Sequence, residues 1–484
     1  EVLKKGGNAV DAAVATAFAL NAAEPFASGI GGGGFMVLYL AREERVTVIN
    51  FRETAPARSN PDMYMEKGEV RDVWRTSHGL AAAVPGALAG WALALHKYGS
   101  MKLEEVMQAG IAIAERGFPV SQTFSQINKD EYEKLLMNAG ESCVYLQDGF
   151  PYEPGEIFRN PDLAKTFRRL AAQGWQDFYR GEIARRIVEA VQRQGGIMEL
   201  EDLARYSPLE QPPLTGTYKG CTLYSIQPPG SGGLHIIQLL NILENWPVKK
   251  WGHNSAEYIH HLSEAFRFVF ADRASYLGDP EFVPVPVENL LSKDYAARIA
   301  ARIKSHELQE SYPPGRFERE QMMKESTTHL GVIDERGNIV SLTQSINDFF
   351  GAGIIPEGTG FLLNNEMADF SPYPDSVNAP RPFHRPVSSM GPIILFKNKE
   401  PFLVLGSPGG PRIFTSLTQI IVNVIEFGMS IDQAIEAPRF FTHSADGAAR
   451  ELSVESRIPD ETIRTLKEIG HLLRIRDAFD KFFG

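Results

Sequence analysis

The chain has 484 residues, of which 43% are hydrophobic and 23% charged, and its formal net charge is -11 with a sequence pI near 5.6. This length and composition are typical of a folded globular protein with a large core and exclude a disordered or fibrous chain. The acidic balance, without a local cluster of Lys and Arg, argues against nucleic acid as a partner.

The cysteine count and the length of the apolar runs also argue against a disulfide or zinc framework and against a membrane span. The cysteines, Cys143 and Cys221, are far apart and form neither a disulfide framework nor a zinc cluster. The longest apolar run, Ala9 to Ala23, contains Asp11 and is shorter than the ~20 residues of a membrane span, so no span is predicted. The chain begins at Glu1 rather than Met, which is compatible with a removed signal peptide and an extracytoplasmic location; without one the protein would be cytoplasmic.

The first elements predict a helix followed by two paired strands. The helix covers Asn8 to Asn21, which is rich in Ala and has no Gly or Pro. The strands cover Phe35 to Leu40 and Val46 to Phe51, which alternate with the strand period. The intervening run Gly29 to Gly34 matches G-x-G-x-x-G, but a dinucleotide loop needs a strand before it and a helix after it. Nucleotide binding is therefore not predicted.

The segment Ser77 to Tyr98 is rich in small residues and is predicted to be helical after a start at Pro85-Gly86. Helices are predicted to dominate from there to about Gln194. A strand from Thr222 to Ile226 then runs through a tight loop into a helix from Leu234 to Asn245. The loop contains Ser231, which offers an alternative nucleophile for a serine hydrolase, although a G-x-S-x-G elbow is absent.

The helix predicted from Ser255 to Tyr276 carries His260, His261, Glu264 and Asp272. Their spacing is not H-E-x-x-H, and adjacent histidines do not share one helix face. We expect solvated or capped polar side chains here and predict no metal.

A flexible leader and a β-hairpin follow. Lys304 to Lys324 is charged and has a Pro-Pro-Gly run, which is typical of exposed chain where cleavage concentrates. Beyond it, the strand-like runs Thr328 to Asp334 and Asn338 to Ile346 flank a loop with Gly337 at its third position.

Pairing Asp334 with Asn338 places Thr327 opposite Ser345, and a bulge would shift this register by one or two residues. Taken alone, two such hydroxyls are a common pair on a solvated sheet face. A cut before Thr327 would give it a free α-amine with a pKa of ~7.7 to 8.0, which can act as general base for its own hydroxyl.

Spacing alone does not decide which hydroxyl of Ser326, Thr327 or Thr328 is the nucleophile. The run Thr-Thr-His-Leu at 327 to 330, with its hairpin, resembles the processing site of γ-glutamyltransferases, which are N-terminal-nucleophile hydrolases. The resemblance covers nearly the whole chain. Its other matching segments are Lys5 to Ala13, Gly31 to Gly34, Asn50 to Pro56, Tyr276 to Pro280, Asn347, Leu362 to Met367 with Asp369, Pro386 to Met390 and Gly406 to Gly410.

The resemblance implies an α/β fold, a four-layer αββα sandwich that forms one structural domain. Self-cleavage between Ser326 and Thr327 would divide the chain into a large fragment, 1 to 326, and a small fragment, 327 to 484, which stay together as a heterodimer. Thr327 would be the nucleophile with Ser345 opposite it, where many relatives have Thr.

The resemblance also implies a pocket for a small γ-glutamyl substrate and no cofactor. Arg52 would bind the substrate α-carboxylate, with Ser388 and Ser389 beside it, because a guanidinium binds a carboxylate with two hydrogen bonds. The α-amino group would be held by Asn347, Glu366 and Asp369.

Gly409 and Gly410 are implied to form the oxyanion hole. Independently, the sequence predicts an amphipathic helix that begins at Pro411 and is closed by Gly428. Amide groups at such an N-terminus suit a developing negative charge.

The implied activity is cleavage of γ-glutamyl amides through an ester at Thr327, which then passes to water or an amine. The stretch from Asp369 to Ser388 is short and rich in proline, where lidded relatives carry a longer loop. That feature resembles poly-γ-glutamate depolymerases and the cephalosporin-acylase-like branch, which remain alternative functions. A noncatalytic binding relative is an alternative of another class.

Overall fold

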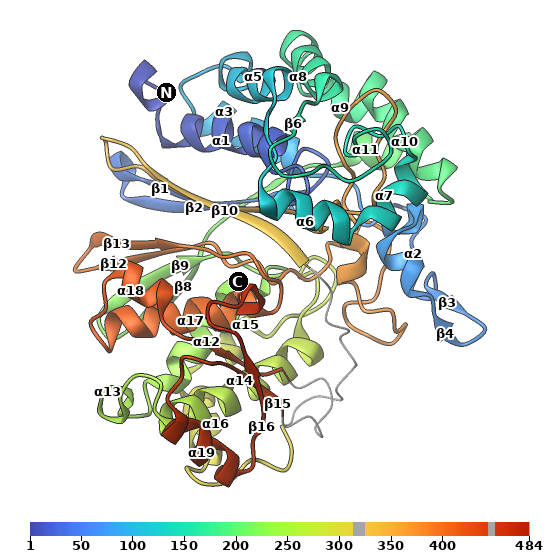
Figure 1. Ribbon diagram of the computed structural model, residues 1–484. Helices are drawn as coiled ribbons and strands as arrows, with labels where there is room; N and C mark the ends of the chain where they lie inside the picture. The colour runs from blue at the N-terminus through green and yellow to red at the C-terminus, as the bar shows by residue number, and fades with distance from the viewer. Residues whose placement is uncertain (313–324, 444–450, 484) are drawn as a thin grey trace. The chain divides into compact units, whose positions relative to one another are not determined.

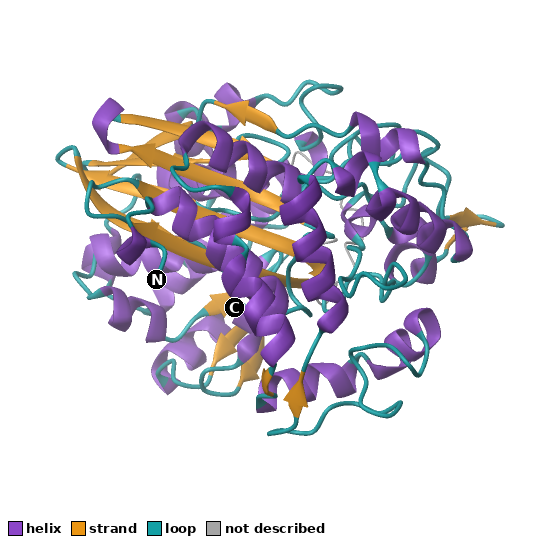
Figure 2. Ribbon diagram, turned by 90° about the horizontal axis from the view of Figure 1, so that it is seen from above, coloured by secondary structure: helices purple, strands orange, loops and turns teal. Residues whose placement is uncertain are grey.

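The computed structural model describes residues 1–312, 325–443 and 451–483 (Figure 1). The chain divides into two compact units. Unit 1 comprises Glu1–Pro212 and Met323–Pro386, and unit 2 comprises Pro213–Met322 and Val387–Gly484. Both units therefore contain segments from either side of the bond between Ser326 and Thr327. Helices and strands are abundant throughout (Figure 2), so the expected mixed α/β class is confirmed.

Unit 1 is built on a five-stranded sheet in which every neighbouring pair is antiparallel. The strand order is β10 (Glu325–Ile333), β11 (Ile339–Asp348), β1 (Gly33–Leu40), β2 (Arg45–Asn50) and β7 (Leu209–Gln211). One face of this sheet is covered by α1 (Ala9–Ala23) and α3 (Ala87–Tyr98), with α5 (Gln108–Arg116) packed on α1 and α8 (Pro161–Gln173) packed on α5 (Figure 1). The sheet and these helices enclose one apolar core.

The first predicted elements are confirmed, and their capping explains where they start. Asn8 caps α1, since its side chain accepts from the amides of Val10 and Asp11 while Asp11 accepts from the Asn8 amide. Helix α3 begins at Ala87, directly after the predicted Pro85-Gly86 start, and ends at Tyr98 as predicted, but residues 77–86 of the predicted segment lie outside it. Val84 instead pairs with Thr54 in a β-bridge, and a residue before proline is disfavoured in a helix.

The rest of unit 1 consists mainly of further helices and two small two-stranded pairs. Its helices are α2 (Asp72–Thr76), α4 (Leu103–Val106), α6 (Gln122–Asp130), α7 (Tyr132–Ala139), α9 (Asp177–Arg180), α10 (Glu182–Arg193) and α11 (Leu200–Arg205). Its two-stranded antiparallel pairs are the hairpin of β3 (Met65–Glu66) with β4 (Glu69–Val70), and β5 (Phe118–Pro119) with β6 (Ile157–Phe158), which are separated in sequence by α6 and α7.

Unit 2 contains a four-stranded antiparallel sheet in the order β13 (Glu400–Leu405), β12 (Ile393–Lys397), β9 (Cys221–Ser225) and β8 (Leu214–Tyr218). Helices α12 (Ser231–Leu243), α14 (Ala256–Tyr276) and α17 (Arg412–Ile425) lie on one of its faces (Figure 1). The remaining elements are α13 (Val248–Trp251), α15 (Val287–Leu290), α16 (Lys293–Arg302), α18 (Ile431–Glu436), α19 (Asp460–Ile469), and a sheet of β14 (Phe440–Phe441), β15 (Glu451–Glu455) and β16 (Leu472–Arg476).

The expectation of solvated polar residues on α14 is wrong, because His260, His261, Glu264 and Asp272 are all buried. They are held by hydrogen bonds within unit 2, which is how a buried polar side chain avoids the cost of losing water. His260 Nδ1 lies 2.9 Å from His471 Nε2, and the two Glu264 oxygens each lie 2.9 Å from Tyr312 Oη.

Within the described residues, no group of three or more His, Cys, Asp and Glu is arranged to hold a metal ion. The same part of the chain has no helix with the length and apolar character to cross a membrane. Of the predicted leader, only residues 304–312 are described, and residues 313–324 lie outside the described residues.

Candidate active site

The predicted hairpin is formed by β10 and β11, and its register is confirmed from Thr328 opposite Gln344 to Ile333 opposite Ile339. Gly337 takes the expected positive φ, 81°, in the connecting loop. The register shifts between Ser326 and Thr328, where Thr327 alone faces both Ser345 and Ile346, so β11 carries a bulge opposite Thr327. A bulge bends its strand and redirects a side chain, and such features are enriched beside active sites.

Thr327 and Ser345 meet as the register predicts. Thr327 Oγ1 lies 3.5 Å from Ser345 Oγ and donates to the carbonyl oxygen of Ser326 at 2.7 Å. Ser345 Oγ donates to the same carbonyl oxygen at 2.5 Å and accepts from the amide of Asn347 at 2.7 Å. The hydroxyl of Ser345 therefore contacts both Thr327 and the peptide group that precedes it.

Asn347 links this hairpin to the chain around Glu366. It has a positive φ of 73°, a conformation that Asn tolerates better than most residues. Its side-chain amide donates to the carbonyl of Asn365 at 3.1 Å, and its own carbonyl accepts from Ser326 Oγ at 2.9 Å. Asn347 is thus fixed between Ser326 and the residue before Glu366.

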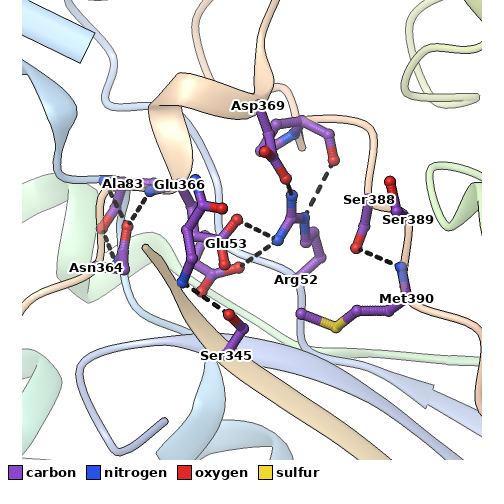
Figure 3. Close-up of polar contacts among 12 residues, drawn as sticks. Arg52, Glu53, Ala83, Ser345, Asn364, Glu366, Asp369, Ser388, Ser389 and Met390 are labelled. Carbon is purple, nitrogen blue, oxygen red and sulfur yellow. Dashed lines mark hydrogen bonds and ion pairs between the residues drawn. The ribbon is translucent and has the colours of Figure 1, made fainter. Parts of the chain in front are cut away.

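Arg52 lies fully buried among three carboxylates in unit 1 (Figure 3). Its Nη1 lies 2.5 Å from Glu366 Oε2 and 3.4 Å from Glu53 Oε2, while its Nη2 donates to Asp369 Oδ2. Arg52 Nε donates to the carbonyl of Pro386 at 3.1 Å. The structure thus brings together three of the predicted substrate-binding residues and adds Glu53.

This cluster has more buried negative charge than one guanidinium neutralises. Burial raises the pKa of Glu53 to about 7 against the opposing effect of Arg52, and it raises the pKa of Glu366 well above its usual range. Glu53 Oε1 and Glu366 Oε1 are buried without a hydrogen-bond partner among the described residues. Two acceptors are therefore present for a bound cationic group.

The glycine-rich run before β1 allows the backbone there to pack closely against Ser345 and Glu53. A Cβ on Gly32 would stand 1.9 Å from the carbonyl oxygen of Ser345, and a Cβ on Gly33 would stand 2.5 Å from the Glu53 carboxyl carbon. Any side chain at either position would displace the backbone. These glycines serve close packing beside Ser345 and Glu53.

Ser388 and Ser389 belong to unit 2 and are buried there. Ser388 Oγ accepts from the amide of Met390 at 3.2 Å (Figure 3), and Ser389 Oγ accepts from Arg273 Nη2 at 3.3 Å. Gly409 and Gly410, also in unit 2, have φ values of 120° and 57° and precede α17. The predicted helix start at Pro411 is confirmed, but the helix ends at Ile425, before Gly428.

The chain is similar to known proteins over nearly its whole length. The family model described as Gamma-glutamyltranspeptidase matches residues 1–482. The glutathione hydrolase proenzyme of Escherichia coli (strain K12) is 40% identical over 493 residues, covering 99% of this chain and 84% of that protein. The chain belongs to the gamma-glutamyltranspeptidase family. The predicted resemblance, and with it the expectation of an enzyme of this family, is confirmed.

Other members of the family are acylases. The acylase ACY 1 proenzyme of Pseudomonas sp. (strain V22) is 38% identical over 478 residues, covering 97% of this chain and 84% of that protein. The crystal structure of the cephalosporin acylase from Bacillus halodurans matches with a TM-score of 0.86 and 29% identity over 100% of this chain and 87% of that one. This member of the gamma-glutamyltranspeptidase family is therefore about as similar in sequence to a protein named glutathione hydrolase as to one named acylase.

The rival nucleophile Ser231 is a poor candidate in this gamma-glutamyltranspeptidase-family chain. Its side chain is fully buried, and its hydroxyl donates to the carbonyl of Ser388 at 2.8 Å. Arg273 Nε donates to the same hydroxyl at 3.3 Å. A nucleophilic serine instead needs a hydroxyl that is accessible and bonded to a base.

Sequence reasoning missed Glu53, Arg273 and the structural role of Asn364. The side chain of Asn364 bonds the backbone of Gly31 and Ala83, at 2.8 to 3.0 Å, and so fixes the chain that carries Glu366. Glu53 follows Arg52 in a segment that matches the family, and this position in the sequence was the signal that could have identified it as a site residue.

Proposed function

We propose that the chain is a self-cleaving γ-glutamyl hydrolase and transferase whose nucleophile is Thr327. The observation that carries the proposal is the hydroxyl of Ser345, which contacts Thr327 Oγ1 at 3.5 Å and the Ser326 carbonyl oxygen at 2.5 Å. One donor thus faces both the attacking group and the oxygen on which negative charge would develop.

Self-cleavage would begin with attack of Thr327 Oγ1 on the carbonyl carbon of Ser326. A C–O bond forms, the hydroxyl proton passes to the Thr327 nitrogen, and the C–N bond breaks to leave an ester. Water then hydrolyses the ester, which yields fragments 1–326 and 327–484 and a free α-amine on Thr327. The proenzyme names of the relatives support this step.

The two fragments would remain together as a heterodimer. Unit 1 joins Glu1–Pro212 of the large fragment to the β10 and β11 hairpin of the small one, and unit 2 likewise takes chain from both. Strand β1 pairs with β11 over seven residue pairs, from Gly33 with Ser345 to Tyr39 with Ile339. We further propose that the two sheets stack in an αββα sandwich as one structural domain.

In turnover, the hydroxyl of Thr327 would attack the γ-carbonyl of the donor while its own amine takes the proton. The amides of Gly409 and Gly410 would stabilise the oxyanion, because among the described residues neither amide donates a hydrogen bond. The leaving amine takes the proton, and a γ-glutamyl ester remains on Thr327. Water then releases glutamate, or an acceptor amine takes the γ-glutamyl group.

The Arg52 cluster supports a donor that carries both a carboxylate and an ammonium group. The α-carboxylate would bind Arg52 with Ser388 and Ser389, and the α-ammonium would bind Glu366, Asp369 and Asn347. Glu366 Oε1 lacks a partner among the described residues and is a ready acceptor for the ammonium. A zwitterion brings one charge of each sign, so binding adds no net charge to a buried site.

A second candidate is an acylase that accepts glutaryl amides or longer poly-γ-glutamate donors by the same steps. It is favoured by the stretch 370–386, which forms turns without a helix or strand, and by the cephalosporin acylase likeness over the whole chain. Glutaryl lacks the α-ammonium, so it would leave Glu366 and Asp369 without their partner.

The test replaces Thr327 with Ala. We expect Thr327→Ala to stay uncut and to release no product from a γ-glutamyl anilide, while Thr327→Ser cuts and turns over more slowly. Assays of glutathione, poly-γ-glutamate and glutaryl-cephalosporin with the wild-type protein separate the donor classes. If Thr327→Ala still cleaved itself at the same bond and still released product, the proposal would be wrong. Wild-type protein that stays uncut and only binds glutamate would indicate a noncatalytic relative.

A further inference from the structure

The loop from Pro229 to Gly232 is packed directly on the backbone of Ser388 and Ser389 within unit 2. The amide of Ser388 donates to the carbonyl of Pro229 at 2.9 Å, and the amide of Ser231 donates to the carbonyl of Ser388 at 2.6 Å. The Ser231 hydroxyl donates to that same carbonyl at 2.8 Å. The backbone of Ser388 is therefore fixed on both sides by this loop.

Gly232 allows this contact because it has no side chain. A Cβ at this position would stand 2.4 Å from the carbonyl oxygen of Met390 and 2.6 Å from that of Ser389. Both neighbours are backbone atoms, which cannot rotate away as a side chain would. The Gly-Ser-Gly-Gly sequence is thus explained as a support for the two serines rather than as a catalytic loop.

Arg273, on α14, contacts both parts of this arrangement. Its Nη2 donates to Ser389 Oγ and its Nε to Ser231 Oγ, each at 3.3 Å. The guanidinium of Arg273 therefore links Ser231, in the supporting loop, to Ser389, one of the two serines proposed to bind the substrate. A planar group with a fixed fork of donors suits such a bridge better than a lysine does.

The polarity of these bonds determines what the serine hydroxyls are able to recognise. Ser389 Oγ accepts from Arg273, and Ser388 Oγ accepts from the Met390 amide at 3.2 Å. Neither hydroxyl donates to another group in the described part of the chain, so each retains its O–H for an external acceptor. A hydrogen bond from a cation also makes the Ser389 hydroxyl a stronger donor. The pair is therefore set to recognise an anion.

We infer that Arg273 is a positioning residue that orients Ser389, and through Ser231 also Ser388, as donors to the carboxylate of the donor substrate. This rests on the proposed function, which assigns the α-carboxylate to these serines. Ser231 then supports the site without taking part in bond making. The inference adds Arg273 and Ser231 to the groups that set specificity for a carboxylate.

The test compares three anilides that differ at one end of the acyl group. γ-Glutamyl carries carboxylate and ammonium, glutaryl carries only the carboxylate, and 4-aminobutanoyl carries only the ammonium. For Arg273→Gln we expect KM, or KI where turnover is too slow, to rise roughly 10-fold for the two acyl groups with a carboxylate. KM or KI for the 4-aminobutanoyl anilide should change little, and so should kcat for all three anilides.

A double-mutant cycle with Ser389→Ala tests whether Arg273 acts through Ser389. In that background we expect Arg273→Gln to have little further effect, because the two residues would act as one unit. Arg273→Lys should recover part of the carboxylate preference. Arg464→Gln, an exposed arginine on α19, is the matched control and should leave all three values at the wild-type level.

Two outcomes would overturn the inference. One is an equal loss for all three anilides in correctly cleaved Arg273→Gln, and the other is a full additive loss on top of Ser389→Ala. A fall in unfolding temperature without a change in carboxylate preference would make Arg273 a purely structural residue, which also contradicts it. If the wild-type protein itself failed to act on the γ-glutamyl anilide, the proposed function would fall instead.

Discussion

The hydroxyl of Ser345 donates a 2.5 Å hydrogen bond to the carbonyl oxygen of Ser326. This carbonyl belongs to the peptide bond that we propose is cut. It also accepts from Thr327 Oγ1 at 2.7 Å, opposite the bulge in β11. The local chain therefore already polarises the carbonyl on which the nucleophile would act.

Ser345→Ala should slow self-cleavage. Removal of one donor to a developing oxyanion typically costs about 10² to 10³ in rate, and here it removes the side-chain donor from β11 to the Ser326 carbonyl. Ser345→Thr keeps the hydroxyl and should cleave at a rate within roughly 10-fold of wild type. The time course of the uncut chain on a denaturing gel measures both, and wild-type kinetics in Ser345→Ala would contradict this role.

Asp369→Asn should separate the two candidate donor classes. The substitution removes one negative charge beside Arg52, so it weakens the contact with an α-ammonium and leaves Arg52 more available to a carboxylate. We expect KM for a γ-glutamyl anilide to rise about 10-fold, while KM for the glutaryl anilide stays the same or falls. Equal losses for both donors would place Asp369 outside ammonium recognition.

Glu53→Gln should change the pH dependence of donor binding. Burial raises the pKa of Glu53 to about 7, so this residue is neutral below that pH and negative above it. Ionised Glu53 competes with the substrate carboxylate for Arg52, and KM for the γ-glutamyl anilide should therefore rise between pH 6 and pH 8.

In Glu53→Gln the group stays neutral, so the rise in KM should disappear while KM at pH 6 stays near the wild-type value. Asp62→Asn, a change at an exposed acid that forms no ion pair among the described residues, is a control for altered charge elsewhere in unit 1. A wild-type pH profile in Glu53→Gln would show that another group titrates.

His329 should make the fold sensitive to acid. Burial lowers its pKa to about 4, whereas an unfolded histidine titrates near 6.5. The unfolded chain thus binds the proton first, and stability falls as the pH drops from about 6.5 towards 4, by up to about 3 kcal/mol. In the wild-type protein, His329 Nδ1 lies 2.9 Å from Thr343 Oγ1. His329→Gln keeps a polar side chain as the partner of this hydroxyl.

Urea unfolding from pH 4 to pH 7 measures this effect. The His329→Gln curve should depend less on pH than the wild-type curve. If both proteins lost the same stability on acidification, another group would be responsible.

Much of the local structure was predictable because it depends on neighbouring residues. The helix start at Asn8, the hairpin turn at Gly337 and the start of α17 at Pro411 are each specified within a few positions. The sequence allowed for a bulge in the hairpin but did not place it, because counting paired residues back from the turn assumes an unbroken ladder; the structure puts it in β11 opposite Thr327.

The site was predictable only in part. Arg52, Glu366 and Asp369 came from the family resemblance, and the structure joins them in one cluster. The only signal for Glu53 was its place beside Arg52 in a matching segment, which does not reveal that it is buried with Glu366. The α14 polar residues were misjudged because their partners, such as His471 and Tyr312, lie far away in sequence.

The central claim is that Thr327 cuts the chain before itself and becomes the N-terminal nucleophile. Intact-mass measurement of the purified wild-type protein, with N-terminal sequencing of the smaller piece, tests it most directly. We expect two fragments that join at 326/327, the smaller beginning Thr-Thr-His-Leu, and one uncut chain for Thr327→Ala. A wild-type chain that stays whole, or that is cut at another bond, would contradict the account.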